Sequence, residues 1–246
     1  MPILEARGVT RYFGGLAAVS NVDFEVREGE VLGLIGPNGA GKTTLFNLIS
    51  AALSPQMGSI TFKDREIVGL KPHKICRMGL ARTFQTVKVF SNKSVLHNVL
   101  LGAYFGRQNR MATKDALSGA KALLEFVELA GEAETLAKDL TLASQKRLEV
   151  ARALATQPEV LLLDEMMEGL NPTEVSKAIS LVKRIQDRGV TVIMIEHVMR
   201  AIMSVCSRII VLHHGAKIAE GTPREISENQ KVIEVYFGAQ TDAANT

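Results

Sequence analysis

A glycine-rich segment near the N-terminus constrains the fold of this chain more than any other feature of the sequence. Residues 36–43 read GPNGAGKT and fit the pattern G-x-x-x-x-G-K-[ST]. The apolar run at 31–35 precedes this segment, and apolar side chains at Leu45, Leu48 and Ile49 follow it at helical spacing. A buried strand, a glycine-rich loop and a helix in this order predict an α/β fold with a parallel sheet.

The loop can wrap a polyphosphate, because glycine lets consecutive backbone N–H groups turn toward one anion without a Cβ in the way. The N-terminus of the following helix adds a partial positive charge. Lys42 supplies a point charge to the β- and γ-phosphates, and Thr43 offers a hydroxyl to Mg²⁺. The alternative is a glycine-rich turn of an unrelated α/β fold, which the complete motif in this context disfavours. The expected phosphate contacts are Gly36, Pro37, Asn38, Gly39, Ala40, Gly41, Lys42, Thr43 and Thr44.

Two acidic residues end an apolar run later in the chain. Asp164 and Glu165 follow residues 160–163, which read VLLL and predict a buried strand. Carboxylates at the mouth of a buried strand are costly unless a cation or a ligand compensates them. Asp164 is therefore a candidate to hold Mg²⁺ through its water shell, and Glu165, on the other face, to polarise an attacking water. An ordinary solvated strand end is the alternative, and the phosphate loop makes it less favoured.

Strand and helix patterns alternate along the rest of the chain, which is typical of parallel βαβ units. We expect strands over much of the first 30 residues and at 58–62, 160–163, 190–195 and 209–212, and helices at 42–52, 144–156, 173–188 and 198–206. Helical spacing at 116–130 predicts an α-helical subdomain inserted at about 86–139. The expected organisation is one domain over residues 1–238 and a flexible tail at 239–246.

Composition excludes several classes of protein. The chain has 246 residues and two cysteines without a CxxC pattern, which excludes a disulfide framework and a cysteine-type zinc site. No apolar run reaches the ~18–20 residues that span a bilayer, and the N-terminus lacks a signal-peptide pattern. The net charge of +3 is too small to indicate a nucleic-acid partner. We therefore expect a soluble, cytoplasmic protein that reaches a membrane only through a partner.

Five motifs in order resemble the ATP-binding subunits of ABC transporters, over essentially the whole chain. The likeness is strongest to the subunits that energise branched-chain amino acid uptake. It is carried by the segments GGLAAV at 14–19, ARTFQ at 81–85, GLNP at 169–172 and IEHVMR at 195–200, and by the C-terminal motif EGTP at 220–223 followed by VIEVYFG at 232–238. The resemblance implies a P-loop NTPase core with an N-terminal antiparallel β subdomain and an inserted α-helical subdomain. It also implies hydrolysis of ATP with Mg²⁺.

Further site residues follow from this resemblance alone. Phe13 matches the aromatic residue that stacks on adenine, and Gln85 matches the glutamine that senses Mg²⁺ and water and links the core to the helical subdomain. His197 matches the histidine that contacts the γ-phosphate. In isolation, each of these side chains would be interpreted as structural or solvated. The implied Mg²⁺ ligands are Thr43, Gln85 and Asp164, and the implied catalytic residues are Lys42, Glu165 and His197.

The sequence departs from the family pattern in two places. Where the family has the signature Leu-Ser-Gly-Gly-Gln, residues 140–144 read LTLAS. In the family this signature caps the nucleotide held by a second subunit, so Leu142 and the Cβ of Ala143 should crowd that approach. Ser144 could still cap the helix that follows. Residues 166–168 read MME where proline and small residues are usual, and sequence drift without kinetic consequence is the alternative for both departures.

The resemblance implies a subunit that couples ATP binding and hydrolysis to a membrane permease for branched-chain amino acids or related solutes. The implied partners are the permease subunits, a second ATP-binding subunit in a homo- or heterodimer and, indirectly, a solute-binding protein, with no nucleic acid. The chain would then lie on the inner face of the cell membrane through permease contacts. Two alternatives stay open: a soluble ABC ATPase outside transport, and a regulatory subunit with one degenerate composite site.

Overall fold

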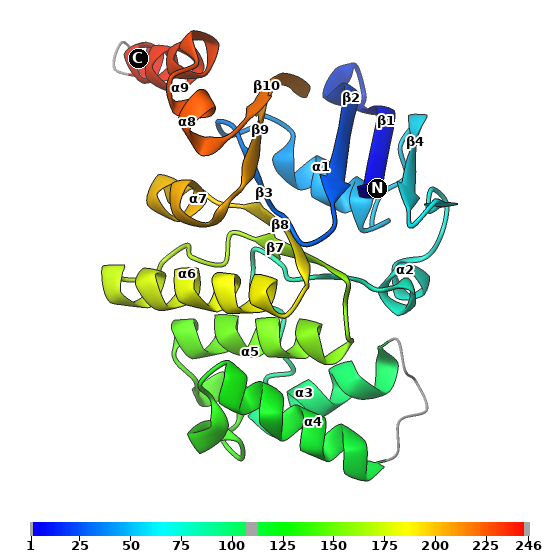
Figure 1. Cartoon of the computed structure of the whole chain (residues 1–246), viewed down its shortest axis with the longest axis vertical. Helices are drawn as coiled ribbons and strands as arrows, with labels where there is room; N and C mark the ends of the chain where they lie inside the picture. The colour runs from blue at the N-terminus through cyan, green and yellow to red at the C-terminus, as the bar shows by residue number, and fades with distance from the viewer. Residues whose placement is uncertain (1, 107–112, 244–246) are drawn as a thin grey trace. The chain divides into compact units, whose positions relative to one another are not determined.

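The computed structural model describes residues 2–106 and 113–243, without the side chains of 237–243 (Figure 1). The chain forms two compact units: residues 1–71 with 191–246 make unit 1, and residues 72–190 make unit 2. Within the described ranges, no helix combines the length and the apolar character that crossing a membrane requires.

Unit 1 contains an antiparallel sheet in the order β2-β1-β4-β5. Its strands are β1 (Pro2–Phe13), β2 (Leu16–Arg27), β4 (Met57–Phe62) and the short β5 (Arg65–Glu66). In β2, Val22, Phe24 and Val26 are buried and alternate with polar residues, as expected for a strand with one face in the core. This sheet is the N-terminal antiparallel β subdomain that the family resemblance implied.

Unit 1 also contains parallel strands that lead to the phosphate loop. They are β3 (Val31–Ile35), β8 (Thr191–Ile195) and β9 (Arg208–His213), and β10 (Ala216–Gly221) pairs antiparallel to β9. Strand β3 pairs with β8 on one side and with β9 on the other, both in parallel. All five residues of β3 are buried, which explains why its sequence is a continuous apolar run. The helices are α1 (Lys42–Ile49), α7 (Met199–Val205), α8 (Pro223–Ser227) and α9 (Gln230–Ala243).

Unit 2 joins a parallel strand pair to a group of helices. Strand β6 (Leu80–Arg82) pairs in parallel with β7 (Val160–Asp164), whose five residues are all buried. Helices α3 (Val95–Phe105), α4 (Thr113–Phe126) and α5 (Leu142–Ala155) pack against one another, as Figure 1 shows. Helices α2 (Pro72–Met78) and α6 (Pro172–Asp187) and two 3₁₀ turns, Ala130–Glu132 and Ala137–Asp139, complete the unit.

The order of strands and helices predicted from the sequence is confirmed, with shifts of a few residues at the ends. The helix expected at 144–156 begins at Leu142, because the Thr141 side chain caps it by accepting a hydrogen bond from the Ser144 backbone N–H. Our assignment of Ser144 as the cap is therefore wrong. Helix α9 continues to Ala243, so it includes part of the segment expected as a tail, and residues 244–246 lie outside the described part.

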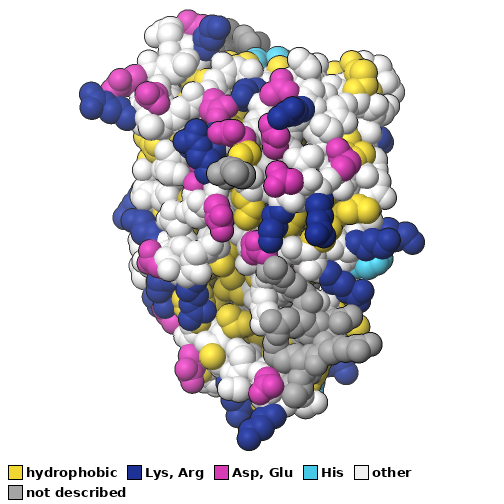
Figure 2. All heavy atoms as spheres, turned by 45° about the vertical axis from the view of Figure 1, so that its right-hand side comes forward, with side chains coloured by type: hydrophobic (Ala, Val, Ile, Leu, Met, Phe, Trp, Pro, Cys, Tyr) yellow, Lys and Arg dark blue, Asp and Glu magenta, His cyan; other side chains and the backbone are white. Residues whose placement is uncertain are grey.

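Charged side chains are mixed on the surface that Figure 2 shows. Among the described residues of this face, Lys and Arg are interspersed with Asp and Glu and form no continuous basic band. The mixed pattern agrees with the small net charge of +3.

Candidate active site

Two glycines give the phosphate loop of unit 1 its shape. Gly36 has φ +152°, and a Cβ added there would lie 2.2 Å from the Leu212 carbonyl oxygen. Gly41 has φ +99°, and its Cβ would lie 2.2 Å from the Ala18 carbonyl oxygen. Both positions therefore require glycine, for conformation and for space. Gly41 is also the N-cap of α1, and because it has no side chain it makes no side-chain cap to the first helical turn.

The Lys42 side chain is folded back into this loop. Its ammonium group donates hydrogen bonds to the Gly36 carbonyl at 2.6 Å and to the Pro37 carbonyl at 3.0 Å, and the residue is only 6% exposed. Thr43 is exposed and Thr44 is half-buried at the start of α1. The loop therefore holds one buried cation and one exposed hydroxyl beside a helix N-terminus, a combination that attracts polyphosphate.

Strand pairing brings a second predicted residue to the same edge of unit 1. His197 follows β8, whose Ile195 pairs with Leu34 of β3, and the phosphate loop follows β3 directly. The carboxyl ends of these neighbouring strands meet at one edge, where α/β folds bind ligands. His197 is exposed at this edge, and the adjacent Glu196 is buried. The only sequence signal for Glu196 is its position next to His197.

Phe13 lies at the end of β1 with 47% of its surface exposed. Its neighbour on β2 is Leu16, and the same strand carries Ala18, whose carbonyl lies against Gly41. The Arg11 guanidinium lies 5.2 Å from the centre of the Phe13 ring. An exposed, flat, apolar ring is suited to stacking on a base.

In unit 2, Asp164 forms a buried ion pair that the sequence did not reveal. An Asp164 carboxylate oxygen lies 2.7 Å from the Arg82 guanidinium, with side-chain exposures of 1% and 7%. The other carboxylate oxygen, Oδ1, is buried and has no hydrogen-bond partner among the described residues. Such an oxygen is normally satisfied in a native structure, so its lack of a partner points to a ligand.

Glu165 is held in an unusual conformation beside Gln85. Its φ of +51° is in the left-handed region, which costs about 1–2 kcal/mol for a residue with a side chain. The Gln85 amide donates a hydrogen bond to the Glu165 carboxylate at 2.8 Å, and Glu165 is only 5% exposed. The structure thus brings together two residues predicted independently, one from its position after a strand and one from the family resemblance. Backbone strain of this kind is concentrated at functional sites.

The segment that departs from the family signature has a well-defined local structure. Leu142 is 46% exposed, and its side chain lies 3.1 Å from where a Cβ of Gly169 would be. Ser144 is buried, donates a hydrogen bond to Glu132 and accepts one from Arg147. The substitutions therefore place an apolar side chain on the surface and a polar group inside, opposite to the usual preference.

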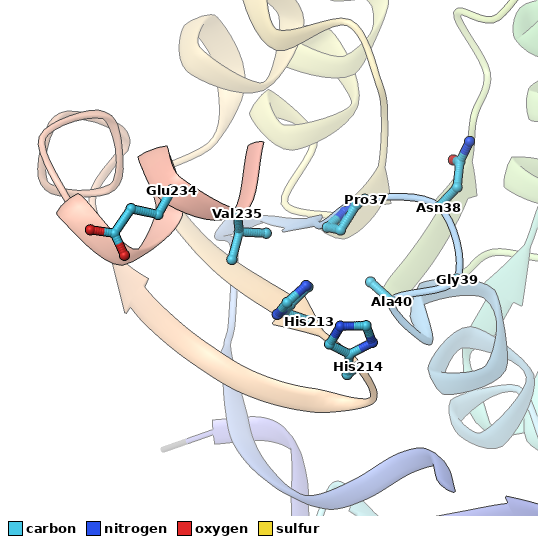
Figure 3. Close-up of a pocket in the computed structure, with 8 residues that line it drawn as sticks. All are labelled: Pro37, Asn38, Gly39, Ala40, His213, His214, Glu234 and Val235. Carbon is cyan, nitrogen blue, oxygen red and sulfur yellow. The ribbon is translucent and has the colours of Figure 1, made fainter. Parts of the chain in front are cut away.

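Two adjacent histidines, His213 and His214, line a pocket together with the phosphate loop. This pocket of about 510 Å³ is formed within unit 1 by Pro37, Asn38, Gly39, Ala40, His213, His214, Glu234 and Val235 (Figure 3). The imidazole rings lie 4.0 Å apart, and burial, together with the neighbouring His214, lowers the pKa of His213. Next to the pocket, burial raises the pKa of Tyr236 on α9, and a hydrogen bond with the Gly36 backbone opposes that rise.

Two family models match most of this chain. The model described as ABC transporter matches residues 19–168. The model described as branched-chain amino acid ATP-binding cassette transporter matches residues 216–242, which include β10, α8 and most of α9.

Curated relatives agree over nearly the full length. The high-affinity branched-chain amino acid transport ATP-binding protein LivG of Salmonella typhimurium is 41% identical over 250 residues, with 96% of this chain and 98% of that protein covered. The corresponding BraF of Pseudomonas aeruginosa is 40% identical with the same coverage.

Solved structures show the same fold. A nucleotide-free ATP-binding cassette from an ABC transporter has a TM-score of 0.87 at 28% identity, with 96% of this chain and 99% of that chain covered. A dimeric cassette in a post-hydrolysis state bound to ADP and Pi has a TM-score of 0.81 at 26% identity, covering 90% and 99%. With the phosphate loop, the strand-borne acids and these relatives together, the chain belongs to the ABC transporter family and is one of its ATP-hydrolysing, ATP-binding subunits.

Proposed function

We propose that this chain is the ATPase subunit of an importer for branched-chain amino acids or related solutes. The named relatives, 40–41% identical over nearly the whole chain, support the solute class. In this proposal the chain binds a membrane permease at the inner face of the cell membrane, pairs with a second ATP-binding subunit and works with a solute-binding protein. The choice of solute lies with the permease and the binding protein.

The observation that carries the proposed chemistry is the buried acid pair at the end of β7. Asp164 Oδ1 is a hard, shielded oxygen with no partner among the described residues, and this fits an oxygen ligand of Mg²⁺ or of its water shell. Thr43 and Gln85 would supply further oxygen atoms. When bound, Mg²⁺ neutralises charge on the β- and γ-phosphates.

The residues of unit 1 would bind ATP. Phe13 stacks on the adenine ring, and the N–H groups of residues 36–41 surround the phosphates. Lys42 already lies inside the loop, where its ammonium donates to two loop carbonyls that phosphate oxygens would replace. His197 donates to the γ-phosphate from the neighbouring strand end. Together these contacts fix the phosphates in line for attack.

Glu165 would orient the attacking water. The water oxygen attacks the γ-phosphorus, the bond between that phosphorus and the bridging oxygen to the β-phosphate breaks, and the Glu165 carboxylate accepts the water's proton. One carboxylate oxygen accepts a hydrogen bond from the Gln85 amide at 2.8 Å. This hydrogen bond fixes the direction of the Glu165 carboxylate within unit 2.

The altered signature at residues 140–144 predicts that the two ATP sites of a heterodimer differ in activity. The exposed Leu142 and the half-buried Ala143 would face the nucleotide held by the partner subunit, where the family has glycines. The impaired site of a heterodimer would then be the one on the partner's phosphate loop. The site on Lys42, Asp164 and Glu165 stays competent if the partner's signature is intact.

The test is ATP turnover by the pair of ATPase subunits reconstituted with their permease in proteoliposomes. Glu165→Gln should remove at least 99% of the turnover, on the order of the 10²-fold loss typical of a lost general base, while ATP binding persists. The equivalent change in the partner should cost less. Equal losses would contradict the asymmetry, and full turnover by Glu165→Gln would contradict the role of Glu165. Strong DNA binding at physiological salt would instead support an ATPase outside transport.

A further inference from the structure

Lys146 is a buried lysine in the first half of α5 that no motif predicts. It is only 6% exposed. Its ammonium group donates hydrogen bonds to the backbone carbonyl of Glu165 at 3.0 Å and to that of Glu168 at 2.6 Å. One side chain of α5 therefore holds both ends of the turn that follows β7.

That turn sets the direction of the Glu165 side chain. Its left-handed backbone, at φ +51°, determines where the Cβ points. Within the turn, the Glu168 N–H also donates to the Glu165 carbonyl, at a longer 3.3 Å. The ammonium of Lys146 adds a shorter, charge-assisted bond to the same oxygen, and bonds of this type are roughly twice as strong as neutral ones.

The neighbours of Lys146 on α5 bind elsewhere. The Gln145 amide donates to the carbonyls of Ala137 and Leu140, and the Arg147 guanidinium donates to those of Val127 and Glu128. These bonds tie α5 to the segment that precedes it. Lys146, between the two, ties the same helix to Glu165 and Glu168.

We propose that Lys146 is a positioning residue for ATP hydrolysis, which acts by holding the Glu165 backbone in the conformation that presents its carboxylate to water. This inference rests on the proposed role of Glu165 in orienting the water. Glu165 is then fixed at two points, its carbonyl by Lys146 and its carboxylate by Gln85. In this role Lys146 acts through Glu165 and not by direct contact with the reacting atoms.

The experiment compares Lys146→Met with the unchanged chain in the reconstituted transporter. Methionine keeps the length and the apolar stem but removes every donor. A displacement of Glu165 by about 1 Å should lower kcat by about 10²-fold, while the KM for ATP changes less than twofold. Lys146→Gln, which keeps one amide group and no charge, should show the same split with a smaller loss. Lys121→Met is the matched control, because Lys121 is exposed on α4, and its turnover should not change.

A double variant separates positioning from loss of structure. If Lys146 acts through Glu165, Lys146→Met should leave the residual hydrolysis of Glu165→Gln and its affinity for ATP unchanged. The inference is overturned if Lys146→Met retains full kcat, if it raises KM and leaves kcat alone, or if it lowers the residual rate of Glu165→Gln by the same factor as in the unchanged chain. Full turnover by Glu165→Gln alone would contradict the proposed role of Glu165 instead.

Discussion

Replacing Arg82 should destabilise unit 2 strongly, because it leaves a buried carboxylate without its counter-charge. In Arg82→Met, Asp164 loses the guanidinium at 2.7 Å, and its Oδ1 already has no partner among the described residues. The side chains are 7% and 1% exposed, so water screens the pair very little and the values for surface pairs do not apply. Breaking such a pair from one side costs about 3–5 kcal/mol.

The loss in the free energy of unfolding should be measured by urea unfolding of the full chain. In thermal unfolding of a chain of this size, a loss of about 3–5 kcal/mol corresponds to a fall in Tm of roughly 6–20 °C. The control is Arg82→Met combined with Asp164→Leu, which removes both charges and should recover much of the stability, because apolar replacement of a whole buried pair is often neutral. The reasoning is refuted if Arg82→Met lowers the free energy of unfolding by less than about 1 kcal/mol, the value expected of a surface pair. It is also refuted if the double variant loses as much stability as the single variants Arg82→Met and Asp164→Leu lose together.

Three further predictions follow from other positions. Gly41→Ala should weaken ATP binding at least tenfold in isothermal titration, because its Cβ would lie 2.2 Å from the Ala18 carbonyl at a φ of +99°. Burial raises the pKa of Glu149. The folded state therefore binds the carboxyl proton of Glu149 more tightly than the unfolded state does, and the stability that this proton contributes is present at low pH and lost as pH rises through the folded pKa. In urea unfolding at a series of pH values, the free energy of unfolding of Glu149→Gln should therefore rise relative to that of the unchanged chain as the pH increases. A difference between the two that does not change with pH would contradict this. Burial raises the pKa of Cys206 to about 12, so at pH 8 its alkylation, followed by mass spectrometry, should be negligible until urea unfolds the chain.

Much of the fold could be predicted because residues that are close together in the sequence carry its pattern. The phosphate loop combines a fixed spacing with an apolar strand before it and a helix after it, and all three features lie within about 20 residues of sequence. Asp164 and Glu165 were found for a similar reason, since two acids directly after four buried apolar residues are unusual.

The partners of these acids could not be predicted. Arg82 lies 82 residues from Asp164, and Lys146 lies 19 residues from Glu165. Little in the sequence distinguishes these two cations from the many exposed ones. The available signal was weak: Arg82 belongs to the segment ARTFQ, which resembles the family, and Lys146 occupies a helix position flanked by Gln145 and Arg147. Long-range ion pairs depend on tertiary packing, which periodicity does not encode. The helix start was misplaced because Thr141 and Ser144 are both acceptable caps and only the structure distinguishes them.

The hydrogen bond between Tyr236 and the Gly36 backbone has a practical consequence for anyone handling this protein. It connects α9 to Gly36, the first residue of the loop that we propose holds the triphosphate. A purification tag fused behind α9, or a protease nick that releases it, would therefore act on the nucleotide cradle even though more than 190 residues of sequence separate the two. For kinetic work, a tag is better placed at the other terminus, where β1 begins in the antiparallel sheet of unit 1.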